Sequence, residues 1–281
     1  MAAITRSTDL DAGWTLTDWR PREFDGLVES IWFFSGATPQ RRERHFPTGT
    51  LDLIVHLGSS SDRYRIVQGN PPGPCAMVSV GGLLVAPMVI EAPPGCCRVL
   101  GIRLLPAGAF SLFGRPLSEL TDQTVDLRLV LGAAADELAE RCEEAASADE
   151  RVRVAGEWVR DRLVRGRQTD SCIARAASEI ERAGGAVGIS ALRQRLGVSK
   201  ARLVAGFIEQ IGVTPKRFAR IVRFRSATAA LRQGPRSLAQ LALACGYYDQ
   251  PHMNAEFREL SGLTPREFLS ATRPHAISLA E

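Results

Sequence analysis

The pattern of hydrophobic and polar positions changes about a third of the way along the chain. From about residue 14 to residue 105, apolar residues come in short runs rich in Val, Ile, Leu, Phe and Trp. Clusters of Gly, Pro, Ser and Asn separate the runs, and such clusters are typical of turns between strands. We therefore expect a β-sandwich or small barrel here. The expected strands are 30–34, 51–57, 64–67, 77–80, 83–90 and 98–104.

After Pro106 the pattern becomes helical. Residues 107–114 predict a short helix, and residues 127–165 are rich in Ala, Leu, Glu and Arg. Such a helical segment either packs on its own domain or forms a dimer seam. We favour packing on its own domain, because a seam needs a longer periodic repetition. We expect a linker at 166–170. The stripe of the second half consists of Val152, Ala155, Trp158, Val159, Arg162 and Leu163, at helical spacing.

The C-terminal part contains an internal repeat. Residues 203–218 align with residues 253–268 at a shift of 50, and the match continues upstream at a shift of 49. Repetition of this kind is typical of a duplicated supersecondary unit. The identical positions are Ala205, Phe207, Glu209, Gly212, Thr214, Pro215 and Phe218, which recur as Ala255, Phe257, Glu259, Gly262, Thr264, Pro265 and Phe268.

Each copy of the repeat has the order of a helix-turn-helix unit. A first helix, 190–196 or 238–245, ends before a glycine that can adopt the left-handed conformation of a sharp turn. An N-cap residue, Ser199 or Asp249, then begins a second helix. A glycine closes each second helix, and a Thr-Pro pair opens the next one. We expect one long helix, 215–233, to join the two units.

The second helices carry polar and basic residues opposite their apolar positions. Residues 170–281 hold 16 Lys and Arg against 9 Asp and Glu, a net charge of +7, whereas the first 169 residues carry −3. Side chains of this kind read base edges or hold phosphates, so we expect double-stranded DNA as the partner rather than a plain helical bundle. The expected DNA-binding residues are Ser199, Lys200, Ala201, Arg202, Val204, Arg223, Asp249, Gln250, Pro251, His252, Asn254 and Arg258.

Composition excludes several classes of protein. The chain is 45% apolar and 23% charged, as soluble globular proteins are, and no apolar run approaches the ~18 residues that a spanning helix needs. Its first residues are too polar for a signal peptide, so we expect a cytoplasmic protein without a membrane partner. The six cysteines form no C-x-x-C pair and have no zinc-finger spacing to histidine. We expect no metal, no cofactor and no enzymatic activity.

Two alternatives stay open. The vicinal pair Cys96-Cys97 is suited to a thiol-based redox or soft-metal sensor, although a strand with one thiol inward and one outward is the ordinary interpretation. A cysteine-dependent DNA repair enzyme can carry a DNA-binding domain of this kind. Such an enzyme needs a thiol activated by a neighbouring His or a metal–thiolate cluster, for which the sequence gives no sign.

A longer pattern of motifs runs through residues 170–272. It comprises Gly197-Val-Ser199, Gly212-x-Thr-Pro215, Arg223-Phe224-x-x-Ala227-x-x-x-Leu231, Leu238-x-x-Leu241-Ala242, Gly246-Tyr-Tyr-Asp249, Phe257-Arg258 and Gly262-x-Thr-Pro265. This region resembles the AraC-type family of bacterial transcription regulators, with Pro251 and Met253 as mild departures. The resemblance implies that each second helix enters a major groove, and that the two grooves are successive ones on the same face of the duplex, ~34 Å apart. It also implies RNA polymerase as a partner if the protein is an activator.

The N-terminal part is similar to a cupin-like sensory domain of one branch of these regulators, through 45–54 (His-Phe-Pro-Thr-Gly-Thr-Leu-Asp-Leu-Ile) and 99–110. The resemblance implies an α+β protein: a cupin-like β-barrel with trailing helices at 1–165, and an all-α domain of two helix-turn-helix units joined by a long helix at 170–275. It further implies a small-molecule effector. The effector, the promoter and a homodimer stay open. Candidate effector-binding residues are Trp32, His45, His56 and Arg103.

Overall fold

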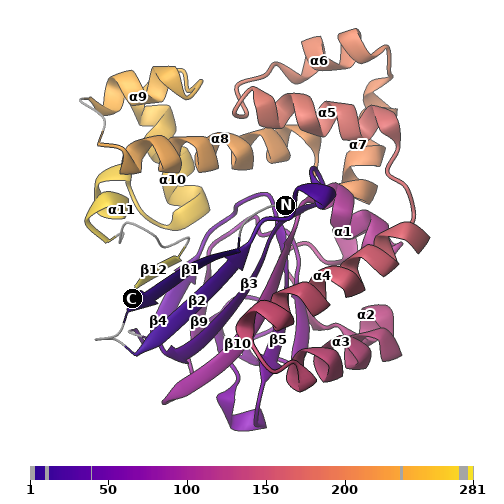
Figure 1. Ribbon diagram of the computed structural model, residues 1–281. Helices are drawn as coiled ribbons and strands as arrows, with labels where there is room; N and C mark the ends of the chain where they lie inside the picture. Colours follow the sequence, from indigo (N-terminus) through magenta and orange to yellow (C-terminus); the bar gives the residue numbers. More distant parts are fainter. Residues whose placement is uncertain (1–3, 10–12, 39, 235–236, 272–277, 281) are drawn as a thin grey trace.

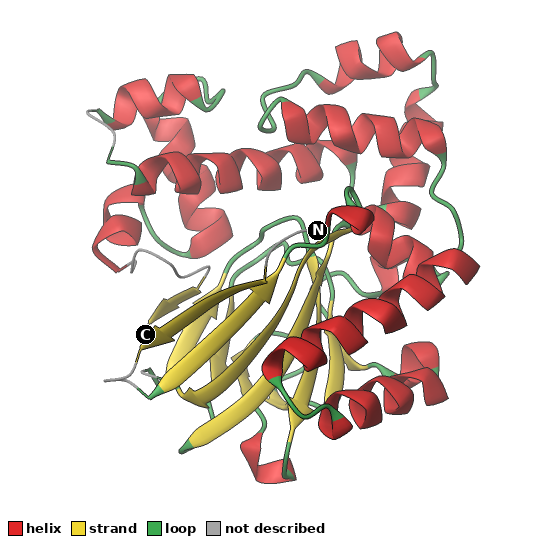
Figure 2. Cartoon of the chain, viewed as in Figure 1, coloured by secondary structure: helices red, strands yellow, loops and turns green. Residues whose placement is uncertain are grey.

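A computed structural model describes residues 4–9, 13–38, 40–234, 237–271 and 278–280. Two antiparallel sheets and the helices that follow them form an N-terminal part, the β-domain, and the remaining helices form a helical domain that lies across one end of it (Figures 1 and 2). One hydrophobic cluster continues from the β-domain into the helical domain. The boundary between 165 and 170 therefore stays a proposal.

The strands form two sheets in which all hydrogen-bonded neighbours are antiparallel. In spatial order, the larger sheet contains β1 (Ile4–Asp9), β2 (Trp14–Trp19), β3 (Val28–Ala37), β10 (Cys96–Leu104), β5 (Leu51–Leu57), β8 (Val78–Gly81) and β11 (Thr124–Asp126). The smaller sheet contains β12 (Ser278–Ala280), β4 (Arg42–His45), β9 (Met88–Glu91), β6 (Arg65–Gln68) and β7 (Gly73–Pro74).

Helices α3 (Ala133–Glu144) and α4 (Ala148–Arg165) cover one face of the larger sheet (Figure 1). The register partners Ile31, Ile102 and Leu53 are fully buried. Trp158 of α4 is 1% exposed and donates a hydrogen bond from Nε1 to the carbonyl oxygen of Ala134 at 3.1 Å. The apolar stripe of α4 thus packs within its own domain, as its short periodic pattern predicts.

Five of the six expected strands are confirmed to within two or three residues, and one is wrong. The expected strand 83–90 is a strand only from Met88 onward. Before that point the backbone N–H of Val85 donates to Asp122 Oδ1 at 2.7 Å, and Leu83 accepts from the backbone of Asp122, so these groups cannot pair with a strand. Pro87, which lacks an N–H, separates this segment from β9. Strand β1 escaped prediction because its residues are mostly polar and exposed.

The helical stretch 127–165 is divided into α2 (Arg128–Leu131), α3 and α4. Gly132 has φ +59 between α2 and α3, and Ser147 caps α4 by accepting from the N–H of Glu150 at 3.2 Å. The short helix expected at 107–114 is α1 (Pro106–Phe113). Single turns of 3-10 helix lie at η1 (Arg22–Phe24), η2 (Ser60–Asp62) and η3 (Leu117–Glu119).

The helical domain confirms the predicted order of elements. A first unit, α6 and α7, and a second unit, α9 and α10, lie at opposite ends of one long joining helix, α8 (Figure 1). The apolar positions expected at the centre of each unit, Leu203, Phe207, Met253 and Phe257, are all buried. The helices are α5 (Ser171–Arg182), α6 (Ile189–Leu196), α7 (Lys200–Gln210), α8 (Pro215–Arg232), α9 (Leu238–Ala244), α10 (Gln250–Ser261) and α11 (Pro265–Ala271).

Candidate nucleic-acid interface

The first unit exposes the beginning of α7. Gly197 ends α6 with φ +65, which turns the chain sharply. The Ser199 hydroxyl oxygen then accepts a hydrogen bond from the N–H of Arg202 at 3.1 Å and caps α7. Lys200, Ala201 and Arg202 are exposed and Val204 is half-buried, whereas the opposite side of the helix is in the core. Three of these four expected DNA-binding side chains are therefore open to a large partner.

The second unit repeats this arrangement. Gly246 follows α9 with φ +76, and Asp249 caps α10 by accepting from the N–H of His252 at 2.8 Å. Pro at the first turn, Pro251, removes no hydrogen bond within the helix there. Pro251, His252 and Arg258 are exposed, while Gln250 and Asn254 are half-buried.

Both units present the same end of their second helices. In Figure 1, α6 and α9 lie on the side of the helical domain away from the β-domain. The opposite ends of α7 and α10 contact the β-domain, since Thr121 Oγ1 donates to the carbonyl of Gly212 at 2.8 Å and Arg44 Nη1 donates to that of Ser261 at 3.2 Å. The N-terminal ends of both second helices, with their orphan N–H groups, thus point away from the β-domain.

Arg202 is held by a weak intramolecular ion pair. Its Nη2 lies 3.2 Å from Asp170 Oδ2, and its side chain is 64% exposed. The pKa of Asp170 is lowered by a hydrogen bond from the N–H of Cys172 and, to a smaller extent, by Arg202. An exposed pair of this kind contributes only about 0–1 kcal/mol, so the guanidinium of Arg202 can exchange Asp170 for a base or phosphate.

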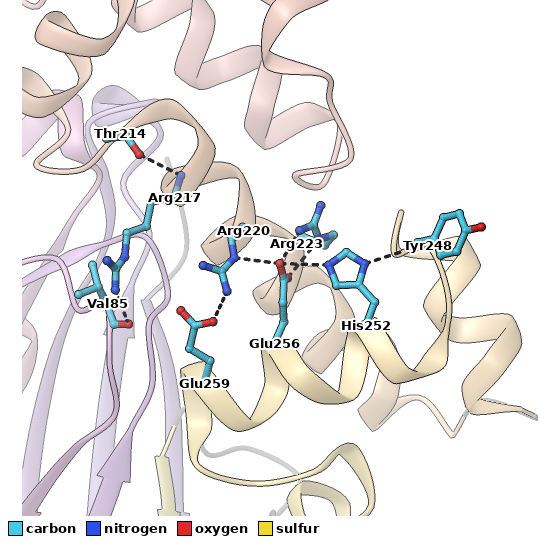
Figure 3. Close-up of polar contacts among 9 residues, drawn as sticks. All are labelled: Val85, Thr214, Arg217, Arg220, Arg223, Tyr248, His252, Glu256 and Glu259. Atoms are coloured by element: carbon cyan, nitrogen blue, oxygen red, sulfur yellow. Dashed lines mark hydrogen bonds and ion pairs between the residues drawn. The ribbon is translucent and has the colours of Figure 1, made fainter.

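Arg223 is mostly buried, and it contacts the same Glu256 oxygen as His252. Its Nη2 lies 2.7 Å from Oε1 of Glu256 (Figure 3). Its guanidinium also stacks over the Tyr247 ring, with 4.9 Å between Cζ and the ring centroid. Its side chain is only 15% exposed. Arg223 is therefore a contact between α8 and α10 in this structure.

The other arginines of the joining helix are also largely partnered within the protein. Arg217 donates to the carbonyl of Val85 in the β-domain at 3.5 Å, and Arg220 Nε lies 2.9 Å from Oε1 of Glu256 (Figure 3). Arg225 pairs with Glu181. The positive charge that the sequence places along this helix is therefore used mostly for internal contacts.

Two residues that the sequence analysis missed belong to the second unit. Glu256 is 4% exposed and is contacted by Arg220 and Arg223, and Tyr248 is 86% exposed directly before the cap of α10. His252 connects them: its Nδ1 accepts from the N–H of Tyr248 at 3.3 Å, and its Nε2 lies 3.6 Å from Glu256 Oε1 (Figure 3).

Comparison of the two copies did not indicate a role for Glu256, because the equivalent position in the first copy is Gly206. A Cβ on Gly206 would lie 2.4 Å from Cδ1 of Ile173, so the first unit has no room for a side chain there. A charged residue within the apolar pattern of 253–260 was the available signal.

Among the candidate effector residues, His56 is a structural residue. It is 2% exposed, its Nδ1 donates to the carbonyl of Ala76 at 3.2 Å, and its Nε2 accepts from the N–H of Tyr64 at 3.3 Å. Burial lowers its pKa to about 4, so the ring is neutral at physiological pH. Both ring nitrogens are occupied by backbone groups.

Trp32 and His45 also make internal contacts. The Trp32 indole covers Gly101, where a Cβ would lie 2.2 Å from the indole ring. Burial lowers the pKa of His45, opposed by Glu43, whose Oε2 lies 3.7 Å from His45 Nε2.

Arg103, the fourth candidate, reaches a pocket between the two domains. The pocket has a volume of about 160 Å³. Arg103 is bound to Asp52 at 2.8 Å and is 12% exposed. The pocket combines guanidinium groups with aromatic rings, and Trp32, His45 and His56 are not among its walls. Its lining includes Arg20, Arg103, Arg225, Arg232, Glu29, Phe46, Phe224 and Phe268.

The described residues contain no group of three or more His, Cys, Asp or Glu side chains arranged to hold a metal ion. Cys96 is exposed and Cys97 is buried, which matches the ordinary interpretation of a strand. Burial raises the pKa of the Cys97 thiol, which disfavours the reactive thiolate. No described helix has the length and apolar character needed to cross a membrane.

Two protein families match the chain. Residues 192–271 match a family described as a helix-turn-helix domain, and residues 21–126 match one described as a domain of unknown function (DUF6597). The first match covers both units and the joining helix, and the second covers most of the β-domain strands.

Curated relatives match over the C-terminal part. The transcriptional activator RhaS of Escherichia fergusonii is 32% identical over 82 residues, which are 29% of this chain and 30% of RhaS. The transcriptional regulator ArgR of Pseudomonas aeruginosa is 30% identical over 76 residues, 27% of this chain and 23% of ArgR. The chain thus spans less than a third of the length of either relative.

Two solved structures also match the chain, with low TM-scores. ToxT from Vibrio cholerae matches 85% of this chain and 97% of its own, with a TM-score of 0.47 and 10% identity. An AraC-type regulator from Chromobacterium violaceum matches 37% of this chain and 95% of its own, with a TM-score of 0.34 and 26% identity.

The geometry of the two capped, outward-pointing helices defines a helix-turn-helix DNA-binding protein with two units in one chain. Its repeat, its joining helix and its curated relatives describe it more closely: its C-terminal domain is similar to the helix-turn-helix domains of AraC-type transcription regulators. The sensing of oxidants or soft metals by Cys96-Cys97 finds no support.

Proposed function

We propose that the protein is a one-component transcription regulator that reads a promoter with both units and responds to a small molecule through its β-domain. The observation that carries the proposal is the duplicated geometry of α7 and α10. Each helix begins with a side-chain cap, Ser199 or Asp249, and each has polar or basic residues exposed at that end. Joined by the rigid α8, the two helices suit successive major grooves.

The proposal assigns different roles to the expected DNA-binding residues. Arg202 and Lys200 suit guanine or phosphate, and Gln250 and Asn254 suit adenine. Asn254 is half-buried on α10 one turn from its N-terminal end, and its Oδ1 would have to turn outward to accept from adenine. Ser199 and Asp249 act by capping the helices. Arg223 contributes indirectly, because it holds α10 in place through Glu256. The proposed surface is completed by Ala201, Val204, Pro251, His252 and Arg258.

Selection of duplexes from a random pool by the full-length chain tests the proposed roles of these residues in base recognition. We expect a site with two half-contacts about one helical turn apart. Arg202→Ala should relax base preference only in one half and Asn254→Ala only in the other, each by about 1–3 kcal/mol of discrimination. Arg266→Ala, an exposed arginine on α11, is the matched control and should change neither half. Binding without any base preference would contradict the proposal.

The pocket between the domains is the proposed effector site. Arginine side chains from both domains meet there beside the rings of Phe46, Phe224 and Phe268. This combination suits a small anion with an apolar part, whose charged group contacts guanidinium. A ligand at this position changes the free energy of domain packing and so biases DNA binding.

The remaining partners follow from this role. RNA polymerase is the proposed partner if the protein activates transcription, and two chains pairing on adjacent sites is a further proposal. Neither requires the apolar stripe of α4, which is already buried within the β-domain.

A further inference from the structure

A short segment of the β-domain, residues 44–49, lies against the helical domain. It leaves β4 at Arg44 and His45 and continues through Phe46, Pro47, Thr48 and Gly49 to β5. His45 is the last residue of β4, whereas Phe46, Pro47, Thr48 and Gly49 lie outside both sheets. The contacts of this segment connect it to the second unit.

The two units differ in how their cores relate to the β-domain. The core of the first unit, with Leu203 and Phe207, belongs to the same hydrophobic cluster as the strands of the β-domain. The core of the second unit, with Met253 and Phe257, forms a separate cluster. Among the described residues, the β-domain contributes one buried side chain to that second cluster, Phe46.

Phe46 packs between aromatic rings of the joining helix and α11. Its ring centroid lies 5.3 Å from that of Phe268 and 6.4 Å from that of Phe224, and it is 5% exposed. Phe224 and Phe268 also contact Phe257 of α10, at 4.9 and 5.9 Å between centroids. Phe46 thus supports the inner side of the second reading helix through two intervening rings.

Polar contacts hold the same segment at both of its ends. Arg44 donates to the carbonyl of Ser261, where α10 ends, at 3.2 Å. Arg225 of α8 donates to the carbonyl of Thr48 at 2.8 Å. Gly49 has φ +84, and a Cβ there would lie 3.5 Å from the Phe218 ring, so the backbone runs directly along α8.

The first unit contacts the β-domain through other residues. Thr121 donates to the carbonyl of Gly212, and a Cβ on Gly212 would lie 2.8 Å from that hydroxyl. The units contact each other mainly through α8, and Gly246 approaches Ala186 of the α5–α6 loop. The β-domain therefore holds the two second helices by separate sets of contacts.

We infer that segment 44–49 is a positioning element. Through Phe46 above all, it determines the position of α10, the DNA-reading helix of the second unit, relative to α7, the DNA-reading helix of the first. This inference rests on the proposed function. A close-packed ring can be displaced only by rearranging its neighbours, so the geometry of the second unit depends on where Phe46 sits. The core of the first unit does not contain Phe46, since it is continuous with the β-domain core instead.

The test uses the full-length chain and the DNA site that it selects. Binding is measured to the intact site, to sites with either half scrambled, and to sites whose halves are moved apart by single base pairs. For Phe46→Ala we expect at least a tenfold loss on the intact site and a broader tolerance of spacing. Its affinity for the site with a scrambled second half should stay within twofold of the wild type. Phe46→Leu should restore part of the loss.

Two further variants keep the result interpretable. Phe33→Ala removes a buried phenylalanine of β3 that lies against Arg151 of α4, and it should leave the spacing profile unchanged. Arg44→Gln provides a milder test of the same segment and should broaden the spacing profile without unfolding the chain. Circular dichroism checks the fold of each variant.

The outcomes separate the inference from the proposed function. A Phe46→Ala variant with the wild-type spacing profile, or with equal losses on both halves, overturns the inference. The same shift in Phe33→Ala also overturns it, because the effect is then a general one of β-domain stability. A wild-type chain that selects no sequence overturns the proposed function itself.

Discussion

At the residue scale, Glu256 is a buried carboxylate beneath the proposed DNA-reading surface of the second unit. It is 4% exposed, and its carboxylate contacts Arg220 and Arg223 of α8 at 2.9 and 2.7 Å. Burial of an unpaired carboxylate would be costly, so these two arginines are what allow it to sit there. In turn Glu256 holds α10 against the joining helix.

Replacing Glu256 by Gln should therefore destabilise the protein and weaken reading by the second unit. The change leaves Arg223 without its carboxylate, and we expect a loss of about 2–4 kcal/mol in the free energy of unfolding. Urea denaturation measures this loss. Glu259→Gln is the matched control, because Glu259 also pairs with Arg220 but is 50% exposed. That control should cost under about 1 kcal/mol, and equal losses in the two variants would contradict the role of Glu256.

At the scale of elements, the two turns show how one motif is used in two environments. Gly197 and Gly246 are repeat equivalents with φ +65 and +76. A Cβ on Gly197 meets nothing within 4 Å, whereas a Cβ on Gly246 would lie 2.4 Å from Cβ of Ala186. The second turn therefore needs glycine both for its backbone conformation and for its close contact with the α5–α6 loop, whereas the first turn needs glycine for its backbone conformation alone.

Alanine substitutions should separate these two requirements. Gly197→Ala carries only the strain of a left-handed residue, about 1 kcal/mol. Gly246→Ala adds overpacking of typically about 1–3 kcal/mol, so its thermal midpoint should fall clearly further. Comparison of the two melting curves by calorimetry checks the order. Equal midpoints would mean that the Ala186 loop moves aside at no cost.

At the scale of the whole molecule, the pocket between the domains is the proposed site at which an effector would contact both domains. Arg232 of α8 lies in its wall and stacks over the Phe268 ring at 5.6 Å. Arg103 and Arg20 enter from the β-domain. A bound anion would therefore contact both domains at once.

Hexanoate, with hexanol as the uncharged comparison, probes this site in the full-length chain. Hexanoate should raise the thermal unfolding midpoint. At 100 times its Kd, it should add about 2.7 kcal/mol to the free energy of unfolding. Arg232→Ala should weaken hexanoate binding about tenfold, since a hydrogen bond to a charged group contributes about 1.5–3 kcal/mol. Arg266→Ala is the control. If hexanol binds as well as hexanoate, the pocket is not an anion site.

Much of the helical domain could be predicted, because its signals are local. Ser199, Asp249 and the glycines of the turns act on their own neighbours in sequence, and the apolar spacing of 203–218 and 253–268 specifies which face is buried. The strand at 83–90 was wrong for the opposite reason: its hydrogen-bond partner, Asp122, lies far along the chain. Local composition carries no information about such a partner.

The amino-acid sequence alone determined the repeat, the two units and the joining helix, since each depends on residues within one or two helical turns of each other. Tertiary structure alone decided which arginines form ion pairs with carboxylates inside the protein, as Arg223 does with Glu256. It also decided that Phe46 enters the core of the second unit, more than 170 residues away along the chain. Contacts over such separations depend on how whole domains pack, and no periodicity in the chain encodes them.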